Sequence, residues 1–461
     1  MSENQIGNPT RREFLKNTGQ VAAASALVSA AAPYAYAAED NTLQVALIGC
    51  GGRGTGAVVN ALKTEGPIKL VAMADVFENR LQRSLNSLKN SKDVGDRIDV
   101  PEDRQFIGFD AYQRAMDCLK PGDIAIFTTP LAFRWVHFDA AIQNGLNVFM
   151  EKPLTADGPT SRRMLDLAKK AEEKNLKVGV GLMSRHQRSL QQLAQRVHGG
   201  EIGDIVMMRA YRMTGPVGSA FSEKWPGTPS ELLWQLQRFH SFIWASGGSF
   251  SDFMIHVIDH CCWMKDAWPV KAQALGGRHY RGESVDQNFD SYSVEYTFAD
   301  GAKLIADGRC VAGCKSIYKS YAHGTKGSAI VSKSGDCGSP SSIYSGQSPD
   351  SSKRLWQSET PPGERNPYDN EWVTLVDAIR NDKPHNEVER GVMGSLATSL
   401  GRLAAHSGQE VTFEELLNSK DEYAPDADKW TMDSPPPVKS DENGKYAIPM
   451  PGLIGAREYL A

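Results

Sequence analysis

The fold follows from one short run of residues, Gln44-Val45-Ala46-Leu47-Ile48-Gly49-Cys50-Gly51-Gly52-Arg53-Gly54-Thr55-Gly56. An apolar segment of strand length leads directly into glycines spaced G-x-G-x-x-G, and residues 57–62 then have the composition of a helix. In such a strand, turn and helix, Gly49 permits the tight turn, Gly51 lets the backbone approach a pyrophosphate, and Gly54 lets the helix pack closely on the strand. The N-terminus of the helix offers free N–H groups to the phosphates. The run therefore predicts a dinucleotide-binding turn that includes Gly52 and Arg53.

A second buried strand, residues 69–74, ends in Asp75. This acid lies about 20 residues past the glycines, where the motif places a carboxylate on the ribose hydroxyls. A carboxylate accepts hydrogen bonds from the 2′- and 3′-hydroxyls and repels a 2′-phosphate, so Asp75 favours NAD over NADP. A glycine pattern alone is weak among 42 glycines, but two strands and an acid in register make it specific.

Length and composition are those of a globular protein. The 461 residues exceed a usual domain of about 150 residues, which predicts two or three domains. Hydrophobic residues make up 41% and charged residues 23%, so a large core is available. A net charge of −4 provides no basic patch for nucleic acid. After residue 40 no apolar run reaches about 18 residues, so no stable membrane anchor is expected.

The first 37 residues resemble a twin-arginine export signal. The run Thr10-Arg11-Arg12-Glu13-Phe14-Leu15-Lys16 precedes an Ala/Val/Ser stretch, and Ala35-Tyr36-Ala37 provides an A-x-A cleavage site. The alternative is a basic patch that opens an Ala-rich surface helix. The resemblance implies the twin-arginine export machinery as a partner and a periplasmic or secreted location. Because this route carries folded substrates, we expect the cofactor to be bound before export.

Seven scattered cysteines do not suggest a disulfide framework, because a chain with so large a core rarely needs one. Cys310 and Cys314 could be two metal ligands, but the partner pair that a closed zinc site requires is absent from the sequence. We therefore expect buried thiols and no metal site.

Hydrophobic patterning predicts two domains and an arm. Residues 42–184 alternate strands and helices, which predicts an α/β domain with a doubly wound parallel sheet. Residues 185–430 contain strands joined by short turns, which predicts an α+β domain with a large, mostly antiparallel sheet. The proline-rich residues 431–461 suggest an extended arm, either wrapped on a neighbouring subunit or solvated. The expected strands are 44–48, 69–74, 123–130, 147–150 and 178–183, then 202–211, 270–276, 291–298, 302–307 and 329–332; the expected helices are 57–62, 78–92, 134–144, 161–174 and 189–198.

A series of motifs resembles the Gfo/Idh/MocA oxidoreductases over residues 43–400. The resemblance implies a Rossmann domain whose motif residues bind NAD, followed by a domain whose sheet carries the substrate face and supports a homo-oligomer. The Glu-Lys-Pro and Asp-x-x-x-His elements are the most specific parts of the match. The matching motifs are the glycine loop, Asp75, Thr128-Thr129-Pro130, His137, residues 145–153 with Glu151-Lys152-Pro153, and Gly247-Gly248 leading to Asp252 and His256.

Three residues are expected to carry the chemistry. Lys152 follows a strand at the sheet edge where ligands bind, and its ammonium would stabilise a developing alkoxide. Asp252 and His256 stand at i and i+4 of a predicted helix, so both can reach one pocket. His256 would take a hydroxyl proton, while Asp252 holds its tautomer or binds substrate. The family places the same three residue types at its catalytic centre. The alternatives are a surface lysine in a Lys-Pro turn and a satisfied core histidine.

Further substrate contacts are expected from side-chain chemistry. Residues 213–246 form a long insertion rich in aromatic residues, where Trp244 would stack on a sugar and Arg238 would bind a hydroxyl or carboxylate. Aromatic side chains would equally anchor the insertion on its own domain. Arg185 and His186 follow the last strand of the first sheet, where the family commonly has a substrate-binding residue.

These features together predict an exported NAD-dependent oxidoreductase that transfers a hydride between a secondary hydroxyl of a sugar, polyol or glycoside and a tightly bound cofactor. Two alternatives remain open. Some relatives cleave glycosides by a redox-neutral cycle of oxidation, elimination, addition and reduction, but their histidine followed by a Gly-x-Gly-x-Tyr-like run is not obvious here. Others are non-catalytic sensors of NAD or sugar, which the retained lysine, aspartate and histidine argue against.

Overall fold

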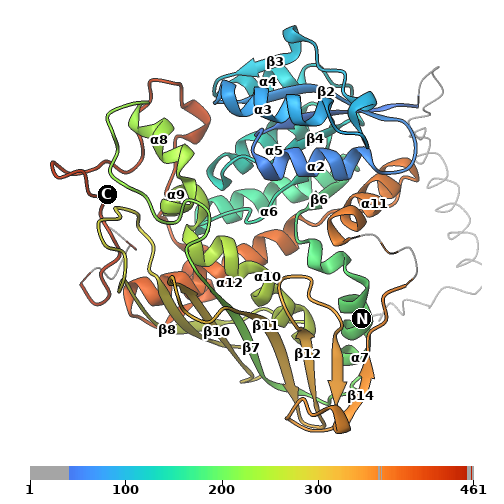
Figure 1. Ribbon diagram of the computed structural model, residues 1–461, viewed down its shortest axis with the longest axis vertical. Coiled ribbons are helices and arrows are strands. Elements are labelled where there is room, and N and C mark those ends of the chain that lie inside the picture. Colours follow the sequence, from blue (N-terminus) through green and yellow to red (C-terminus); the bar gives the residue numbers. More distant parts are fainter. Residues whose placement is uncertain (1–40, 362–363, 365, 454–457, 459–461) are drawn as a thin grey trace, which may run out of the picture. The chain divides into compact units, whose positions relative to one another are not determined.

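The first sheet is the predicted parallel one. The computed structural model describes residues 41–361, 364, 366–453 and 458, so the proposed signal at residues 1–37 lies outside the described residues. From Leu43 onward the chain builds two sheets (Figure 1). The first contains β1 (Leu43–Ile48), β2 (Ile68–Asp75), β3 (Gln105–Ile107), β4 (Ile124–Phe127), β5 (Asn147–Met150) and β6 (Val178–Val180), in the order β3-β2-β1-β4-β5-β6.

Helices cover both faces of this sheet, because alternate side chains of each strand point to opposite sides. Leu47 packs with α2 (Gly52–Leu62) and α3 (Glu78–Lys89). Ile48 packs on the other side with α4 (Ala111–Met116), α5 (Arg134–Gln143) and α6 (Gly158–Glu173). The doubly wound α/β prediction is therefore confirmed. Helix α6 starts at Gly158 rather than at Ser161, because the Asp157 carboxylate accepts a hydrogen bond from the Thr160 amide at 2.9 Å and caps it there.

The second sheet is mostly antiparallel, as predicted. It contains β7 (Ile205–Thr214), β8 (Lys271–Gly277), β9 (Ser291–Thr297), β10 (Lys303–Cys310), β11 (Ile317–Gly324), β12 (Ser328–Ser332), β13 (Ser342–Tyr344), β14 (Arg354–Gln357) and β15 (Val411–Thr412). Their order is β14-β13-β12-β11-β7-β10-β9-β8-β15. Strands β7 and β10 form a parallel pair, with Met207 opposite Lys303. Local sequence patterns predicted neither β11, β13, β14 and β15 nor the short β3 of the first sheet.

Two long helices separate the sheets. Figure 1 shows α10 (Gly248–Lys265) and α12 (Val388–Ser407) running between the first sheet's helices and the second sheet. Their buried apolar residues belong to one continuous core that includes residues of both sheets. Helix α10 therefore brings residues of the second half of the chain toward the first sheet. The shorter α7 (Arg188–His198) and α13 (Phe413–Asn418) complete this part of the chain.

Helix α11 (Pro367–Arg380) returns to the first sheet and lies beside α2 (Figure 1). Its Trp372 is fully buried, with its ring 4.5 Å from that of Phe149 in β5. Leu375 and Val376 join the same apolar cluster as β1 and α2. The core around the first sheet thus depends on a helix that lies far beyond residue 184.

The aromatic insertion and the C-terminal arm pack on each other. Within residues 213–246 the chain forms α8 (Glu231–Gln237), a 3₁₀ turn at Phe239–Ser241, and α9 (Ile243–Ser246). Trp234 of α8 stacks on Tyr446 of the arm at 6.1 Å, and the Gln235 amide donates to the Val438 carbonyl at 2.6 Å. Val438 and Tyr446 of the arm are thus buried against the insertion of the same chain, while most of the arm's other described residues are exposed.

No helix in the described part of the chain has the length and apolar character needed to cross a bilayer. All seven cysteines lie at described positions and are unpaired there. Cys50, Cys261 and Cys262 are buried thiols, whereas Cys314 is exposed.

Candidate active site

A cavity of about 500 Å³ opens at the carboxyl ends of the first sheet's strands. This is the edge where open α/β sheets bind ligands, and the volume is in the usual range for ligand sites. The cavity brings together every residue predicted to bind the cofactor and all three predicted catalytic residues. The predicted residues that line it are Gly49, Gly51, Gly52, Arg53, Gly54, Asp75, Thr128, Thr129, Pro130, His137, Glu151, Lys152, Asp252 and His256.

The glycine loop has the shape that a dinucleotide requires. Gly49 has φ of +97°, and a Cβ there would lie 2.8 Å from the Thr128 backbone. A Cβ on Gly54 would lie 2.2 Å from the Gly49 carbonyl oxygen, so only glycine lets α2 start this close to β1. Gly51 and Gly52 face open space instead. A side chain at either position would enter the space that a pyrophosphate fills, so the loop fits the cofactor.

Asp75 ends β2 with both carboxylate oxygens fixed by backbone amides. Oδ2 accepts from the Cys50 N–H at 2.6 Å, and Oδ1 accepts from the Phe77 N–H at 2.9 Å. Each oxygen keeps a second lone pair for a ligand hydroxyl. The carboxylate is thus held against the glycine loop, where a ribose diol would meet it.

One wall of the cavity includes two side chains of α5. Arg134 donates to the carbonyls of Phe127 at 2.6 Å and Thr129 at 2.9 Å, and so fixes the turn after β4. Burial lowers the pKa of Arg134 to about 10. Burial, with the nearby Arg134 charge, lowers the pKa of His137 to about 3, so this imidazole is a neutral part of the wall. Sequence reasoning missed Arg134, whose only signal is its place just after the Thr-Thr-Pro turn.

The Arg53 side chain leaves the glycine loop toward α11. Its Nε lies 2.6 Å from Glu151 and its Nη2 lies 3.3 Å from Glu371, while the guanidinium stacks 4.6 Å over the Tyr368 ring. Burial and then the Glu151 charge raise the pKa of Glu371 well above its usual range. Arg53 therefore ties the loop to two acids. Tyr368 and Glu371 were missed because they lie more than 300 residues from the loop.

Lys152 meets Asp252 across the cavity. The Lys152 ammonium donates to the Asp252 carbonyl at 2.9 Å and lies 3.3 Å from Oδ1 of the same residue. These contacts take two of its three N–H donors, so among the described residues one donor stays available for a substrate oxygen. The predicted juxtaposition of these two residues is present in the structure.

Asp252 holds a different histidine from the expected one. Its Oδ2 lies 3.4 Å from Nε2 of His240, in the 3₁₀ turn after α8. Burial alone would raise the pKa of Asp252, but the Lys152 charge and a hydrogen bond from His240 hold it well below its usual range. Nδ1 of His256 has no hydrogen-bond partner among the described residues. The expectation that Asp252 fixes the His256 tautomer is therefore wrong. Sequence reasoning placed His240 in the insertion but not in the site.

His256 itself lines the cavity one helical turn from Asp252. Burial, followed by the Lys152 charge, holds its pKa well below the usual range. The imidazole is thus neutral near physiological pH and can accept a hydrogen bond from a hydroxyl.

Four predicted substrate residues do not line the cavity. Arg185 is held by both Asp259 oxygens, at 2.7 and 2.9 Å, and His186 contacts Glu387 at 3.1 Å. Trp244 is buried in the core of the insertion with its N–H on Gln235, and Arg238 is exposed. Trp244 therefore follows the alternative prediction, in which it anchors the insertion to its own chain, whereas Phe239 of the insertion lines the cavity. The four residues are Arg185, His186, Arg238 and Trp244.

A glycine turn, an acid that ends the second strand, and a lysine and histidine facing the same cavity together suit a nicotinamide dinucleotide, the cofactor of one class of oxidoreductase. Two family models fit the chain. Residues 43–182 match the oxidoreductase family with the NAD-binding Rossmann fold, and residues 190–330 match the GFO/IDH/MocA C-terminal domain. The chain belongs to the Gfo/Idh/MocA oxidoreductase family.

Curated relatives are inositol dehydrogenases. The chain is 27% identical over 142 residues to inositol 2-dehydrogenase of Corynebacterium glutamicum, which covers 30% of this chain and 40% of that protein. It is 26% identical over 225 residues to scyllo-inositol 2-dehydrogenase (NAD(+)) of Bacillus subtilis, which covers 48% of this chain and 53% of that protein. The chain thus spans about half the length of the curated relatives it matches.

Solved structures share the fold. Aldose-aldose oxidoreductase from Caulobacter crescentus, complexed with glycerol, superposes with a TM-score of 0.60 at 16% identity, covering 80% of this chain and 99% of that one. Scyllo-inositol dehydrogenase from Lactobacillus casei, with bound NAD(H) and scyllo-inositol, has a TM-score of 0.57 at 21% identity, covering 81% and 99%.

Proposed function

We propose that this protein is an NAD-dependent dehydrogenase for a secondary hydroxyl of a sugar, polyol or glycoside. The observation that carries the proposal is the Lys152 ammonium beside Asp252 and His256, in the same cavity as the glycine loop and Asp75. The curated inositol dehydrogenases and the structural likeness to a sugar oxidoreductase support a polyhydroxylated substrate.

The chain's own residues divide the work between binding and catalysis. The glycine loop and Asp75 would hold the cofactor, which when bound would supply the hydride acceptor for the carbon that bears the hydroxyl. The remaining donor of Lys152 holds the substrate oxygen and stabilises the negative charge that develops on it. Neutral His256 accepts the proton of the hydroxyl. In the reverse direction the same groups stabilise the alkoxide and return the proton.

The test is turnover by Lys152→Ala. We expect kcat to fall about 100- to 1000-fold, because the developing oxyanion loses its cation, while NAD still binds. The wild-type protein and Lys152→Ala are assayed on a panel of inositols, aldoses and glycosides by the absorbance of reduced nicotinamide. Lys69→Ala, a change at an exposed lysine, is the matched control. Equal turnover by wild type and Lys152→Ala would remove the lysine from the mechanism.

The same assay separates the two alternatives. Release of an aglycone from a model glycoside, with no added cofactor and no net reduced nicotinamide, would indicate the redox-neutral hydrolase instead. Binding of NAD with turnover of no carbohydrate in the panel would indicate a sensor. Denaturing the native protein and identifying any released nicotinamide shows whether the cofactor is tightly held.

Export and self-assembly are parts of the same proposal. The sequence of residues 1–37 supports twin-arginine export to the periplasm or beyond, with the cofactor already bound. Replacing Arg11 and Arg12 by lysine should keep the protein in the cytoplasmic fraction. Exposed apolar side chains on the second sheet, Leu275 and Leu355, support a homo-oligomer through that sheet, which light scattering in solution would detect.

A further inference from the structure

His240 is the one further polar side chain that touches the carboxylate of Asp252, among the described contacts of that residue. The two oxygens have separate partners, because Oδ1 lies 3.3 Å from the Lys152 ammonium and Oδ2 lies 3.4 Å from His240 Nε2. The carboxylate cannot rotate without losing one of these contacts. Its orientation therefore depends on where the His240 ring is held.

The protonation state of the ring follows from its other nitrogen. The backbone N–H of Ser219 lies 3.3 Å from His240 Nδ1, and the Ser219 hydroxyl lies 3.1 Å from the same atom. A backbone amide can only donate, so Nδ1 accepts and the proton of the neutral ring is on Nε2. The nitrogen that carries this proton is the one that lies 3.4 Å from Asp252 Oδ2.

Packing fixes the plane of the ring. The Phe253 ring lies nearly parallel to it at 5.3 Å, and the Phe239 ring lies at 3.9 Å. Gly218 is beside the ring, where an added Cβ would lie 2.8 Å from the imidazole, and its φ is +55°. These neighbours restrict the orientation of the imidazole, which lies on the wall of the cavity.

A buried polar network ties this segment to the start of α10. The Asn288 amide donates to the His240 carbonyl at 2.9 Å, and its Oδ1 accepts from the Ser249 N–H at 2.7 Å. One side chain therefore spans the turn that carries His240 and the helix that carries Asp252.

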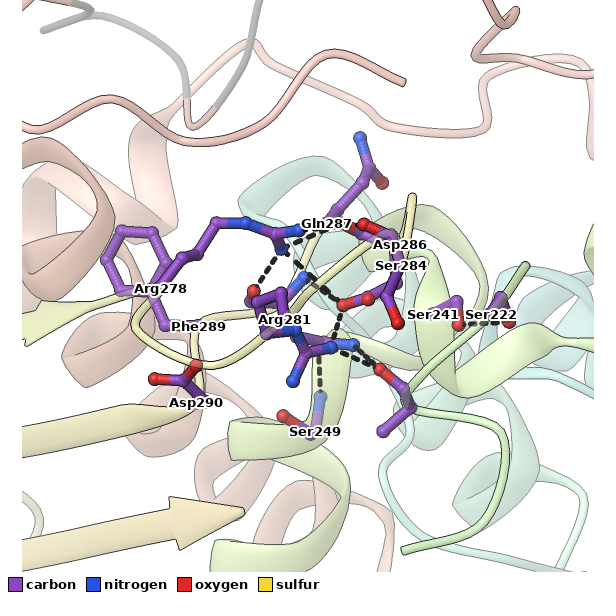
Figure 2. Close-up of polar contacts among 12 residues, drawn as sticks. Ser222, Ser241, Ser249, Arg278, Arg281, Ser284, Asp286, Gln287, Phe289 and Asp290 are labelled. Atoms are coloured by element: carbon purple, nitrogen blue, oxygen red, sulfur yellow. Dashed lines mark hydrogen bonds and ion pairs between the residues drawn. The ribbon is translucent and has the colours of Figure 1, made fainter. Parts of the chain in front are cut away.

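Ion pairs and hydrogen bonds also hold the loop that contains Asn288, which connects β8 to β9. Figure 2 shows Arg281 bound to Asp286 in that loop. It also shows the hydroxyls of Ser222 and Ser241, both in the insertion, in contact with each other. The Asp286 carboxylate also accepts from the Asn288 N–H at 3.0 Å. These buried contacts leave the turn that carries His240 little freedom to move away from α10.

We propose that His240 is a positioning residue for dehydrogenation, which holds the Asp252 carboxylate so that Lys152 faces the substrate oxygen and His256 stays free to take the proton. The proposal rests on the function proposed above. It goes beyond the lysine, aspartate and histidine of the family motifs, because His240 comes from the insertion at residues 213–246.

Contact with His240 should also affect how activity depends on pH. The charged or titratable groups that face Asp252 are Lys152 after β5, Arg134 of α5, His256 of its own helix, and His240. Activity needs the Asp252 carboxylate ionised, so it falls as the pH drops through the pKa of this group. Removal of His240 removes one cause of the low pKa. The acid limb of the activity profile then moves to higher pH.

The experiment compares His240→Phe with His240→Gln. Phenylalanine keeps the ring stacking and removes the donor, so kcat should fall about 10- to 100-fold with little change in KM. Glutamine carries a donor at a similar reach, so it should recover most of kcat, with a smaller shift of the acid limb. His198→Phe, at an exposed histidine of α7, is the matched control. Thermal melting and NAD binding report whether each variant is folded.

Each outcome decides the proposal. A His240→Phe variant with wild-type kcat and an unmoved acid limb overturns it, as does a His240→Gln variant no better than phenylalanine. If His240→Phe does not fold, the test depends on His240→Gln alone. That variant should then have a kcat and a pH profile of activity close to those of the wild type. If kcat falls in Lys152→Ala but not in His240→Phe, the proposed function stands and the positioning role of His240 is wrong. A wild-type protein that turns over no alcohol overturns both.

Discussion

Asp75 shows how backbone amides can prepare one side chain for one ligand. The Cys50 and Phe77 N–H groups hold its two oxygens, so the carboxylate is oriented before any cofactor arrives. Preorganisation of this kind lowers the entropy that binding must overcome. The same negative charge would oppose a 2′-phosphate, so we expect Asp75 to determine the choice of cofactor.

We expect Asp75→Ser to raise the Kd for NAD about 10-fold or more, because the ribose loses charged hydrogen-bond acceptors. The Kd for NADP should fall relative to that for NAD, because the repulsion is gone. Isothermal titration with both cofactors measures the two constants. Asp103→Ser, at an exposed aspartate, is the control. An unchanged ratio of the two Kd values would show that another residue selects the cofactor.

Sequence reasoning found the site residues that belong to local motifs. The glycine loop, Asp75 and Lys152 each follow a strand of the first sheet, and the carboxyl ends of parallel strands meet at one edge. It did not find Arg134, His240 or Glu371. Arg134 and His240 reach the cavity, and Glu371 reaches Arg53, through tertiary packing that no local motif marks.

At the level of elements, α11 completes the core beside the first sheet. Trp372 covers Phe149, and Glu371 of the same helix meets Arg53 of the glycine loop. One helix therefore both buries an apolar flank and holds the loop that binds phosphates.

We expect Trp372→Ala to lower the free energy of unfolding by about 3–5 kcal/mol, because it leaves a large cavity beneath α11. NAD affinity should fall in parallel, since Arg53 then loses a firmly placed partner. Chemical denaturation and cofactor titration measure the two effects. Val373→Ala, at the exposed next residue, should change stability by less than about 0.5 kcal/mol. A stable Trp372→Ala protein with normal affinity would show that α11 is not needed by the loop.

The elements of the first sheet were easier to predict than those of the second. Alternating strands and helices with right-handed connections leave few possible arrangements, and the predicted strands of the first domain are present. In the second sheet, β7 pairs in parallel with β10 and antiparallel with β11. Such neighbours depend on crossovers through α10 and on the packing of α12, which no local pattern encodes.

Across the whole molecule, one buried acid links the end of the chain to the central helix α12. Glu458 lies within 2.9 Å of two Arg402 nitrogens and 2.7 Å from His406 Nδ1. Both Arg402 and Glu458 are almost fully buried. Burial would raise the pKa of Glu458, but the Arg402 charge and the His406 contact hold it well below its usual range.

We expect Glu458→Gln to lower the free energy of unfolding by about 3–5 kcal/mol at neutral pH, because Arg402 keeps a buried charge without its counterion. A depressed folded-state pKa adds stability above the unfolded value of about 4.3 and loses it below. The difference in free energy of unfolding between wild type and Glu458→Gln should therefore become smaller as the pH falls below about 4.3. Denaturation at several pH values measures it, with exposed Glu442→Gln as control. A gap that does not change with pH would contradict this account.

The late position of α11 in the chain affects how the protein is made. A ribosome has synthesised every strand of the first sheet by residue 180, yet the helix that covers Phe149 begins only at Pro367. Until then the nascent chain exposes an apolar flank of the kind that chaperones shield. A fragment that ends near residue 184 would keep that flank open permanently, so we expect it to aggregate rather than bind a nucleotide.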